Sequence, residues 1–489
     1  MTATTGLEGL KDKDLFRQAA LIGGEWVQAD DGDTIDVINP ATDTALGQIP
    51  NLGRAQTRLA IEAADRAFQS WRHVPHGDRA QALERWFQLM TDHADDLALI
   101  LTLEQGKPLA EAKGEITYGA SFVKWFAEEA RRIDGAVIPA PTPDRQIVVL
   151  KQPVGVSAII TPWNFPNAMI TRKVAPALAA GCTVVIKPAE ATPYSALAMA
   201  VLAERAGIPP GVINVVTGHP KDIGAELTEN MTVRKLSFTG STRIGSVLMG
   251  QCAPSVKRLS LELGGNAPFI VFDDADLDAA VEGAMASKFR NGGQTCVCSN
   301  RILVQDGVYD AFAAKLADRV KALKVGPGTA PGVDIGPMIN AAAIEKIRRH
   351  VTDAIDKGAK VLAEAQVPAG ENYATPIVLG NAQPGMELAD EETFGPVAPL
   401  FRFQTEDEAI AFANATPFGL AAYFYTDSHK RAWRVGQALE FGMVGLNTGA
   451  ISTAVAPFGG VKLSGVGREG GHAGIEEYLE TKAFHMAGL

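Results

Sequence analysis

The chain has 489 residues, of which 46% are hydrophobic and 21% are charged, as is typical of a large folded protein with more than one subdomain. Its formal net charge of −11 and the lack of a long Lys/Arg block argue against binding to nucleic acid. No apolar stretch reaches the roughly 18 residues of a membrane helix, and the first residues lack the apolar core of a secretion signal. We therefore expect a cytoplasmic protein without a membrane partner.

The cysteines and histidines exclude two further kinds of site. Only four cysteines occur, too few for a disulfide scaffold, which indicates free thiols in a reducing compartment. The eight histidines include no HExxH motif and no Cys/His grouping with zinc spacing. We therefore expect no bound metal.

The pattern of apolar residues changes twice along the chain. Short β-like runs between residues 20 and 50 predict a hairpin or ribbon. From about residue 55 to 132 the apolar residues recur at helical spacing, which predicts a layer of helices. From residue 153 onward, short apolar runs alternate with helix-like segments, and this alternation is typical of a parallel α/β fold.

A second alternating series follows Gly265, with PFIVFDD, RILV, a helix near residues 309–324, VAPLFRF and MVGL as its clearest members. The sequence therefore predicts two parallel α/β subdomains. The β-like segments around residues 145–150 and 478–482 belong to neither series. We expect these two segments to form a separate ribbon.

The segment FRNGGQTCVC, residues 289–298, places Cys296 after a polar loop that contains two glycines. A cysteine nucleophile needs an accessible, deprotonatable sulfur near backbone donors, and a glycine-rich turn permits that approach. The alternative is a buried cysteine that only packs.

In the segment LSLELGG, residues 259–265, the leucines share one face of a predicted strand, and Glu262 lies on the other face. A carboxylate at the end of a parallel strand, beside two glycines, is a candidate general base. The alternative is a glutamate that faces solvent.

Two more loops follow predicted strands. In TPWNFP, residues 161–166, the side-chain amide of Asn164 could donate a hydrogen bond to a developing oxyanion. The segment FTGSTRIG, residues 238–245, joins a strand to a helix, where backbone N–H groups favour phosphate. It is not the GxGxxG fingerprint and is a weak signal by itself.

These segments, together with VIKPAE at residues 185–190 and EETFGP at residues 391–396, resemble the aldehyde dehydrogenase superfamily in order and spacing. The resemblance spans nearly the whole chain. It implies an α/β fold of two Rossmann-like parallel subdomains and a small β-ribbon oligomerisation element. The implied NAD(P)-binding domain comprises residues 1–133 and 153–264, the catalytic domain residues 265–460, and the ribbon residues 134–152 and 476–489. A homo-oligomer, either a dimer or a tetramer, is expected.

The resemblance also implies a mechanism. The Cys296 thiolate attacks an aldehyde, and the Asn164 amide and the backbone N–H of Cys296 hold the resulting oxyanion. Hydride passes to nicotinamide and leaves a thioester. Water that is deprotonated by Glu262 hydrolyses this thioester, so the expected product is a free acid.

The family's cofactor residues carry over to three groups of positions. Trp163, Lys187 and Glu190 are expected near the adenosine ribose. Glu190 predicts NAD over NADP, because a carboxylate binds the ribose 2′-hydroxyl but repels a 2′-phosphate. The positions expected near the phosphates are Gly240, Ser241 and Gly245, and those expected near the nicotinamide ribose are Glu392 and Phe394.

Within the superfamily, the chain most resembles succinate-semialdehyde dehydrogenases, through NFPNAMITRK at residues 164–173, KFRNGGQTCVCSN and the ending APFGGVKLSGVGREGG. In that subfamily, the residues matching Arg172, Arg290 and Ser452 bind the distal carboxylate of the substrate. Two guanidinium groups and a hydroxyl suit a carboxylate far better than an apolar aldehyde. The alternative is that the two arginines are surface or structural residues.

Several alternatives stay open. Glutarate semialdehyde is one methylene longer than succinate semialdehyde, and the sequence cannot separate the two or exclude a broader range of aldehydes. Esterase activity and a nucleotide-binding protein without catalysis are the competing classes. Cys298 could form a disulfide with Cys296 on oxidation, although a bridge across one residue is strained.

Overall fold

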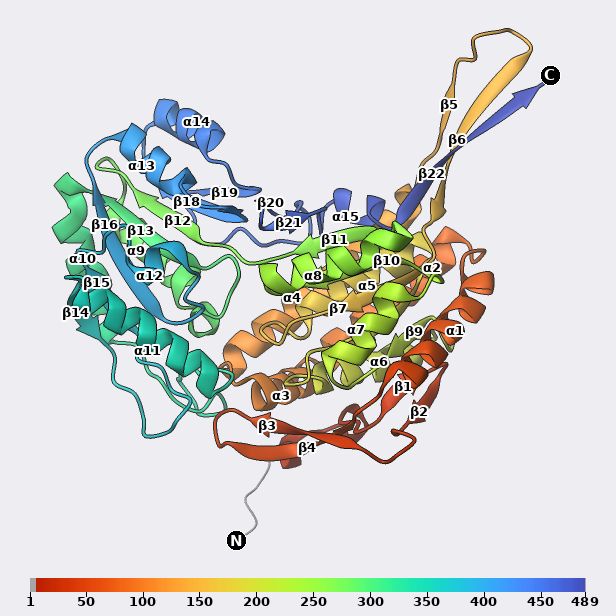
Figure 1. The fold of residues 1–489 in the computed structure, drawn as a ribbon, viewed down its shortest axis with the longest axis horizontal. Coiled ribbons are helices and arrows are strands. Elements are labelled where there is room, and N and C mark those ends of the chain that lie inside the picture. Colours follow the sequence, from red (N-terminus) through yellow and green to blue (C-terminus); the bar gives the residue numbers. More distant parts are fainter. Residues whose placement is uncertain (1–5, 489) are drawn as a thin grey trace.

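The computed structural model describes residues 6–488. Residues 1–5, in the expected NAD(P)-binding domain, and residue 489, in the expected ribbon, lie outside the described part. The chain folds into two α/β parts, and a long ribbon projects from the body (Figure 1). Across residues 6–488, no helix is both long enough and apolar enough to cross a membrane.

The first α/β part is built on a sheet with the strand order β2-β1-β9-β8-β7-β10-β11-β21. The strands from β9 to β11 are parallel and largely buried. Chain order reverses between β7 and β10, and this kind of switch point is where open α/β sheets bind ligands. The strands are β1 (Ala20–Ile22), β2 (Glu25–Val27), β7 (Val156–Ile160), β8 (Thr183–Lys187), β9 (Ile213–Val215), β10 (Val233–Thr239), β11 (Arg258–Glu262) and β21 (Gly465–Val466).

The helices predicted between residues 55 and 132 are confirmed and pack against this part, with α4 lying along α5. The expected N-terminal hairpin is confirmed as well, because β1 pairs with β2 and a second ribbon pairs β3 (Thr34–Asn39) with β4 (Thr44–Pro50). The helices are α1 (Arg54–Trp71), α2 (His76–Asp92), α3 (Ala94–Gln105), α4 (Leu109–Glu129), α5 (Ala168–Ala180), α6 (Tyr194–Arg205), α7 (Pro220–Glu229) and α8 (Thr242–Cys252).

The second α/β part has the strand order β14-β15-β16-β13-β12-β18-β19. Its strands are β12 (Ala267–Val271), β13 (Ser299–Gln305), β14 (Lys360–Glu364), β15 (Ile377–Gly380), β16 (Val397–Phe403), β18 (Ala421–Tyr425) and β19 (Met443–Leu446). A short pair joins β17 (Phe418–Gly419) to β20 (Val461–Lys462). The helices from here to the C-terminus are α9 (Leu277–Lys288), α10 (Asp306–Lys321), α11 (Ala341–Asp356), α12 (Glu387–Asp390), α13 (Glu406–Asn414), α14 (His429–Ala438) and α15 (Ala473–Glu476).

A short segment connects the two sheets. Residues 263–266 join the end of β11 to the start of β12, so the carboxyl edge of the first sheet lies next to the amino edge of the second sheet. A loop that precedes a strand of the second sheet therefore lies close to the switch point of the first.

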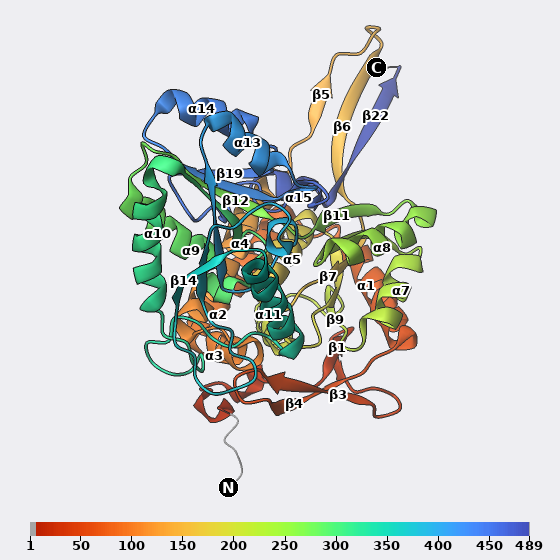
Figure 2. The same ribbon diagram turned by 60° about the vertical axis from the view of Figure 1, so that its left-hand side comes forward.

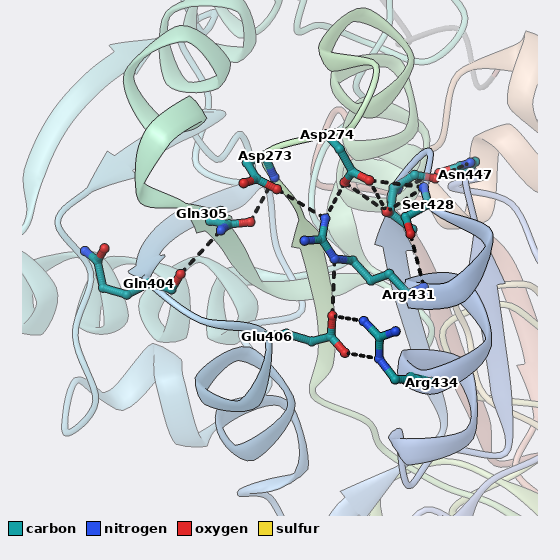
Figure 3. Close-up of polar contacts among 10 residues, drawn as sticks. Asp273, Asp274, Gln305, Gln404, Glu406, Ser428, Arg431, Arg434 and Asn447 are labelled. Atoms are coloured by element: carbon teal, nitrogen blue, oxygen red, sulfur yellow. Dashed lines mark hydrogen bonds and ion pairs between the residues drawn. The ribbon is translucent and has the colours of Figure 1, made fainter.

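Ion pairs lie at the carboxyl edge of the second sheet, and Figure 3 shows them. Arg431 of α14 donates to Asp274 at 2.5 Å, to Asp273 at 3.2 Å and to Glu406 at 3.2 Å. Arg434 donates to both carboxylate oxygens of Glu406 at 2.9 Å. Charged side chains thus occupy this second switch point, where chain order reverses between β12 and β18.

The projecting ribbon is an antiparallel sheet with the order β22-β6-β5, and Figures 1 and 2 show it standing away from the body in both views. It consists of β5 (Ala136–Ile138), β6 (Arg145–Pro153) and β22 (Leu479–Ala487). Apolar side chains on it are exposed, with Val137 64% and Phe484 50% accessible. Exposed apolar residues on an unpaired edge are features of an association surface.

Candidate active site

The carboxyl ends of neighbouring strands in the first sheet bring several predicted site residues to one edge. Lys187 ends β8 and pairs in register with Ile160, the last residue of β7, which leads into the loop carrying Asn164. On the other side, Thr239 of β10 pairs with Glu262 of β11. Residues far apart in the sequence therefore share one edge, because parallel strands end together.

A cavity of about 290 Å³ lies at this edge and also reaches the second α/β part. Seven of its lining residues were predicted from the sequence. They are Trp163, Asn164, Gly240, Ser241, Cys296, Glu392 and Phe394. Candidate nucleophile and candidate cofactor residues thus face the same space.

Cys296 lies in the loop between α9 and β13, and the loop's left-handed backbone explains its composition. Asn291, Gly292 and Gly293 have φ values of 52°, 61° and 77°, a conformation that favours glycine and asparagine. A side chain at Gly293 would meet the Gly395 carbonyl oxygen at 2.2 Å. Cys296 is partly exposed, whereas the other three cysteines are buried. The alternative of a fully buried Cys296 is wrong.

The surroundings of Cys296 favour the neutral thiol over the thiolate. Burial raises its pKa to about 12, while the positive charge of Arg172 acts in the opposite direction. A thiolate nucleophile therefore requires a group that accepts the proton.

Asn164 is fixed in place by contacts from several elements. Its Nδ2 donates to the Gln294 carbonyl at 3.0 Å, which ties it to the cysteine loop. The backbone carbonyl of Asn164 accepts from Lys107 Nζ at 2.8 Å and from Asn291 Nδ2 at 3.0 Å. The amide has a second N–H, for which the described residues provide no acceptor, and Asn164 lines the same cavity as Cys296.

A buried ion pair that the sequence reasoning missed supports this loop. Lys107 Nζ donates to Glu115 Oε2 at 2.6 Å, and Glu115 Oε1 accepts from the backbone N–H groups of Asn167 and Ala168 at 2.9 and 3.2 Å. Glu115 thereby caps the start of α5. The only sequence signal was a lysine and a glutamate eight residues apart, and Glu111 and Lys113 between them left this pair unmarked.

Glu262 is buried, so the alternative of a solvent-facing side chain is wrong. Neither of its carboxylate oxygens has a hydrogen-bond partner within residues 6–488. Burial, reinforced by the negative charge of Glu469, raises its pKa well above the ordinary value. Gly459 makes room for this side chain, since a Cβ there would lie 2.9 Å from Glu262 Oε1.

The polar groups of the cavity fit a dinucleotide. Thr239 Oγ1 and Glu392 Oε1 are buried without a partner in the described part of the chain. Both oxygens could form hydrogen bonds with the ribose or amide groups of a dinucleotide. Ser241 caps α8 by accepting from the Ile244 N–H at 3.4 Å, and the start of a helix favours phosphate. Gly245 packs α8 closely, because a Cβ there would lie 2.4 Å from Leu263.

Two aromatic residues of the cavity lining and one charged pair complete the predicted cofactor residues. The rings of Trp163 and Phe394 meet edge to face, with centroids 5.6 Å apart. Lys187 Nζ lies 3.3 Å from Glu190 Oε2, so a counter-charge accompanies the carboxylate that was expected to select NAD. Burial lowers the pKa of Lys187, and Glu190 opposes this.

The predicted carboxylate-binding residues converge around Tyr118 of α4. Arg172, Arg290 and Ser452 all act electrostatically on its hydroxyl. Arg172 is 1% exposed, so the surface alternative is wrong for this residue. Its Nε donates to Glu469, a residue that the sequence reasoning missed, while its Nη2 has no partner among the described residues. Arg290 Nε is likewise buried and unpaired there.

Cys298 is hydrogen-bonded to the preceding helix. Its thiol is buried and donates to the Lys288 carbonyl at 3.3 Å.

Comparison with known proteins gives a consistent result. Residues 26–484 match the aldehyde dehydrogenase family. The chain is 61% identical to a glutarate-semialdehyde dehydrogenase of Pseudomonas putida, over 97% of this chain and 98% of that protein. It is 60% identical to a succinate-semialdehyde dehydrogenase [NADP(+)] of Escherichia coli, again over 97% and 98%. It is also 60% identical to the crystallised succinate-semialdehyde dehydrogenase of Burkholderia pseudomallei, with a TM-score of 0.97 over 98% of this chain and 100% of that one. On the arrangement of its sheets and on these matches, the chain belongs to the aldehyde dehydrogenase family.

Proposed function

We propose that the enzyme uses NAD(P) to oxidise succinate semialdehyde to succinate, with glutarate semialdehyde as the alternative substrate. The observation that carries the proposal is a pair of buried guanidinium nitrogens, Arg172 Nη2 and Arg290 Nε, which have no partner within residues 6–488. Both arginines act electrostatically on the partly exposed Cys296. Buried guanidinium N–H groups without an acceptor favour a ligand that brings negative charge. The names of the Pseudomonas and Escherichia relatives, both semialdehyde dehydrogenases, support this substrate class.

In the proposed reaction, Arg172, Arg290 and Ser452 hold the distal carboxylate and so present the aldehyde carbon to Cys296. The Cys296 thiol gives its proton to Glu262 directly or through water, and the sulfur forms a bond to the aldehyde carbon. The carbonyl oxygen becomes an oxyanion, which accepts hydrogen bonds from the Asn164 amide and the Cys296 backbone N–H.

Trp163, Lys187, Glu190, Gly240, Ser241, Gly245, Glu392 and Phe394 are the residues proposed to hold the dinucleotide. When bound, the oxidised dinucleotide supplies the hydride acceptor. Glu262 next releases the thiol's proton to solvent. Water then attacks the thioester left on Cys296 and passes a proton to Glu262. The sulfur leaves and takes this proton back, which releases the carboxylic acid and restores the thiol.

The test is kcat/KM from absorbance at 340 nm with succinate semialdehyde, glutarate semialdehyde and uncharged butanal. We expect both semialdehydes to exceed butanal by about 100-fold or more, since each charge-assisted hydrogen bond contributes roughly 1.5–3 kcal/mol. Comparable values for butanal would remove the substrate proposal but leave the dehydrogenase chemistry standing.

An arginine variant sharpens this test. Arg290→Gln should lower kcat/KM for the semialdehydes by about 10- to 100-fold and leave butanal nearly unchanged. Arg402→Gln is the matched control, because Arg402 lies on the surface and pairs with Asp306 and Asp310.

We further propose that NAD is preferred over NADP, on the strength of the Glu190 carboxylate. The relative whose name specifies NADP(+) gives this preference no support, and Lys187 partly offsets the charge of Glu190. Glu190→Gln should therefore raise kcat/KM for NADP by about 10-fold, because it removes repulsion of the 2′-phosphate. A wild-type enzyme that already favours NADP would contradict the preference.

The domain roles complete the proposal. The NAD(P)-binding domain comprises residues 1–133 and 153–264, and the catalytic domain comprises residues 265–460. The ribbon joins subunits into a dimer or tetramer, and a homotetramer is the state we propose. The exposed apolar residues of the ribbon support association, and four free thiols suit the cytoplasm. Light scattering should show that Phe484→Asp dissociates the oligomer.

A further inference from the structure

Tyr118 of α4 presents a buried hydroxyl to the carboxylate pocket. Within the described chain, no residue makes a hydrogen bond of normal geometry with this hydroxyl, although Ser452 lies beside it. The ring itself is held firmly, since it packs edge to face on Phe122 with centroids 5.0 Å apart. Buried tyrosine hydroxyl groups ordinarily find a partner, so an unpaired one calls for an explanation.

The surroundings of the hydroxyl are those of an anion site. Arg172 and Arg290, which each have an unpaired buried nitrogen, approach it from α5 and from the cysteine loop. Glu469, which acts electrostatically on the hydroxyl, already accepts from Arg172 Nε and from Lys173 Nζ. The carboxylates of Glu111 and Glu115 accept from the Asn291 N–H and from Lys107. Arg172 Nη2, Arg290 Nε and the Tyr118 hydroxyl have no partner among the described residues.

Tyr118 and Arg290 also line one cavity of about 240 Å³, and the ring of Phe165 forms part of its wall. The Arg290 guanidinium lies 4.8 Å from the centroid of the Phe165 ring, which holds it in place. The phenol hydroxyl and the guanidinium thus occupy fixed positions around one space.

The Tyr118 hydroxyl can serve as a hydrogen-bond donor. Burial raises its pKa, and this effect outweighs the opposite influence of Arg172 and Arg290. The neutral phenol carries one O–H to donate, while a carboxylate offers about four acceptor positions on its two oxygens. Arg172, Arg290, Ser452 and Tyr118 together match that number.

We propose that the Tyr118 hydroxyl donates a hydrogen bond to the distal carboxylate of the semialdehyde and is a specificity-determining residue. This inference rests on the proposed function, because it requires a substrate with a carboxylate. Tyr118 thus joins Arg172, Arg290 and Ser452 in the proposed carboxylate site, although no sequence motif singled it out.

The variant Tyr118→Phe removes only the hydroxyl and keeps the ring against Phe122. We expect KM for succinate semialdehyde to rise by about 10- to 100-fold with kcat within a factor of about two, the loss typical of one hydrogen bond to a charged acceptor. Butanal kinetics should not change. Tyr373→Phe is the matched control, because Tyr373 also has a buried, unpaired hydroxyl but lies outside the pocket.

Two independent readouts keep the inference falsifiable. The concentration of succinate that protects Cys296 from iodoacetamide should rise about 10-fold in Tyr118→Phe, which reports binding without turnover. The melting temperature should not fall, because the hydroxyl has no partner in the described chain; a clear fall would mean that it has one and would overturn the inference. Equal losses for the semialdehyde and butanal, or no loss, would do the same. Absence of semialdehyde preference in the wild type would instead remove the proposed function.

Discussion

Arg172 has one guanidinium nitrogen paired and another unpaired: Nε donates to Glu469, whereas Nη2 is buried without a partner in the described residues. Glu469 also accepts from Lys173, so one buried carboxylate accompanies two buried cations. Burial by itself would favour the neutral acid, but Arg172 and Lys173 outweigh it and hold the pKa of Glu469 below its ordinary value. The two cations outnumber the carboxylate that they share, which supports the proposed binding of a substrate carboxylate.

Glu469→Gln should destabilise the protein, because it leaves the buried Arg172 and Lys173 without their carboxylate. Removing one partner from a buried ion pair typically costs about 3–5 kcal/mol. Thermal unfolding measures the effect. The control is Glu480→Gln, since Glu480 is exposed and its ion pair with Arg258 should contribute less than about 1 kcal/mol. Equal melting temperatures for the two variants would contradict the role given to Glu469.

Alkylation of Cys296 should depend steeply on pH. Because burial holds the pKa of its thiol at about 12 in the enzyme without cofactor, the thiolate fraction rises ~10-fold for each pH unit below that value. The rate of reaction with iodoacetamide should therefore increase from pH 7 to pH 9 without a plateau. Mass spectrometry of the Cys296 peptide follows it, with Cys298→Ala as the control. A plateau below pH 9 would show that the resting thiol is acidic.

Glu262→Gln should separate the two halves of the reaction. Without a base to activate water, the thioester should accumulate on Cys296, and kcat should fall by roughly 10²–10⁴-fold. Rapid mixing should give a burst of reduced dinucleotide, and intact-protein mass spectrometry should detect the acylated enzyme. If neither appears, Glu262 is required before the thioester forms, as acceptor of the thiol proton.

Arg431→Ala should lower stability without changing catalysis. The substitution removes the cation shared by Asp273, Asp274 and Glu406 at the far edge of the second sheet (Figure 3). We expect a loss of about 1–3 kcal/mol in chemical denaturation, because three hydrogen-bonded carboxylates lose a partner. Arg402→Ala is the exposed control. A change in kcat/KM would show that this edge communicates with Cys296.

Part of the architecture followed from local pattern alone. The alternation of short apolar runs with helical segments predicted both parallel sheets, because strands buried on both faces must be apolar throughout. The segments around residues 145–150 and 478–482 differed from that pattern, and they pair as the β22-β6 ladder. The strand order, however, could not be derived, since nothing local specifies which strands are neighbours.

The sequence by itself determined which residue types carry the chemistry: a cysteine after a glycine-rich loop, a glutamate before two glycines and an asparagine after a strand. Only the tertiary structure decided what surrounds them. Glu469 lies 297 residues from Arg172, and Tyr118 of α4 lines one cavity together with Arg290 of the cysteine loop. Motifs are read over a few neighbouring residues, whereas burial and electrostatic pairing are decided by contacts between segments that only folding brings together.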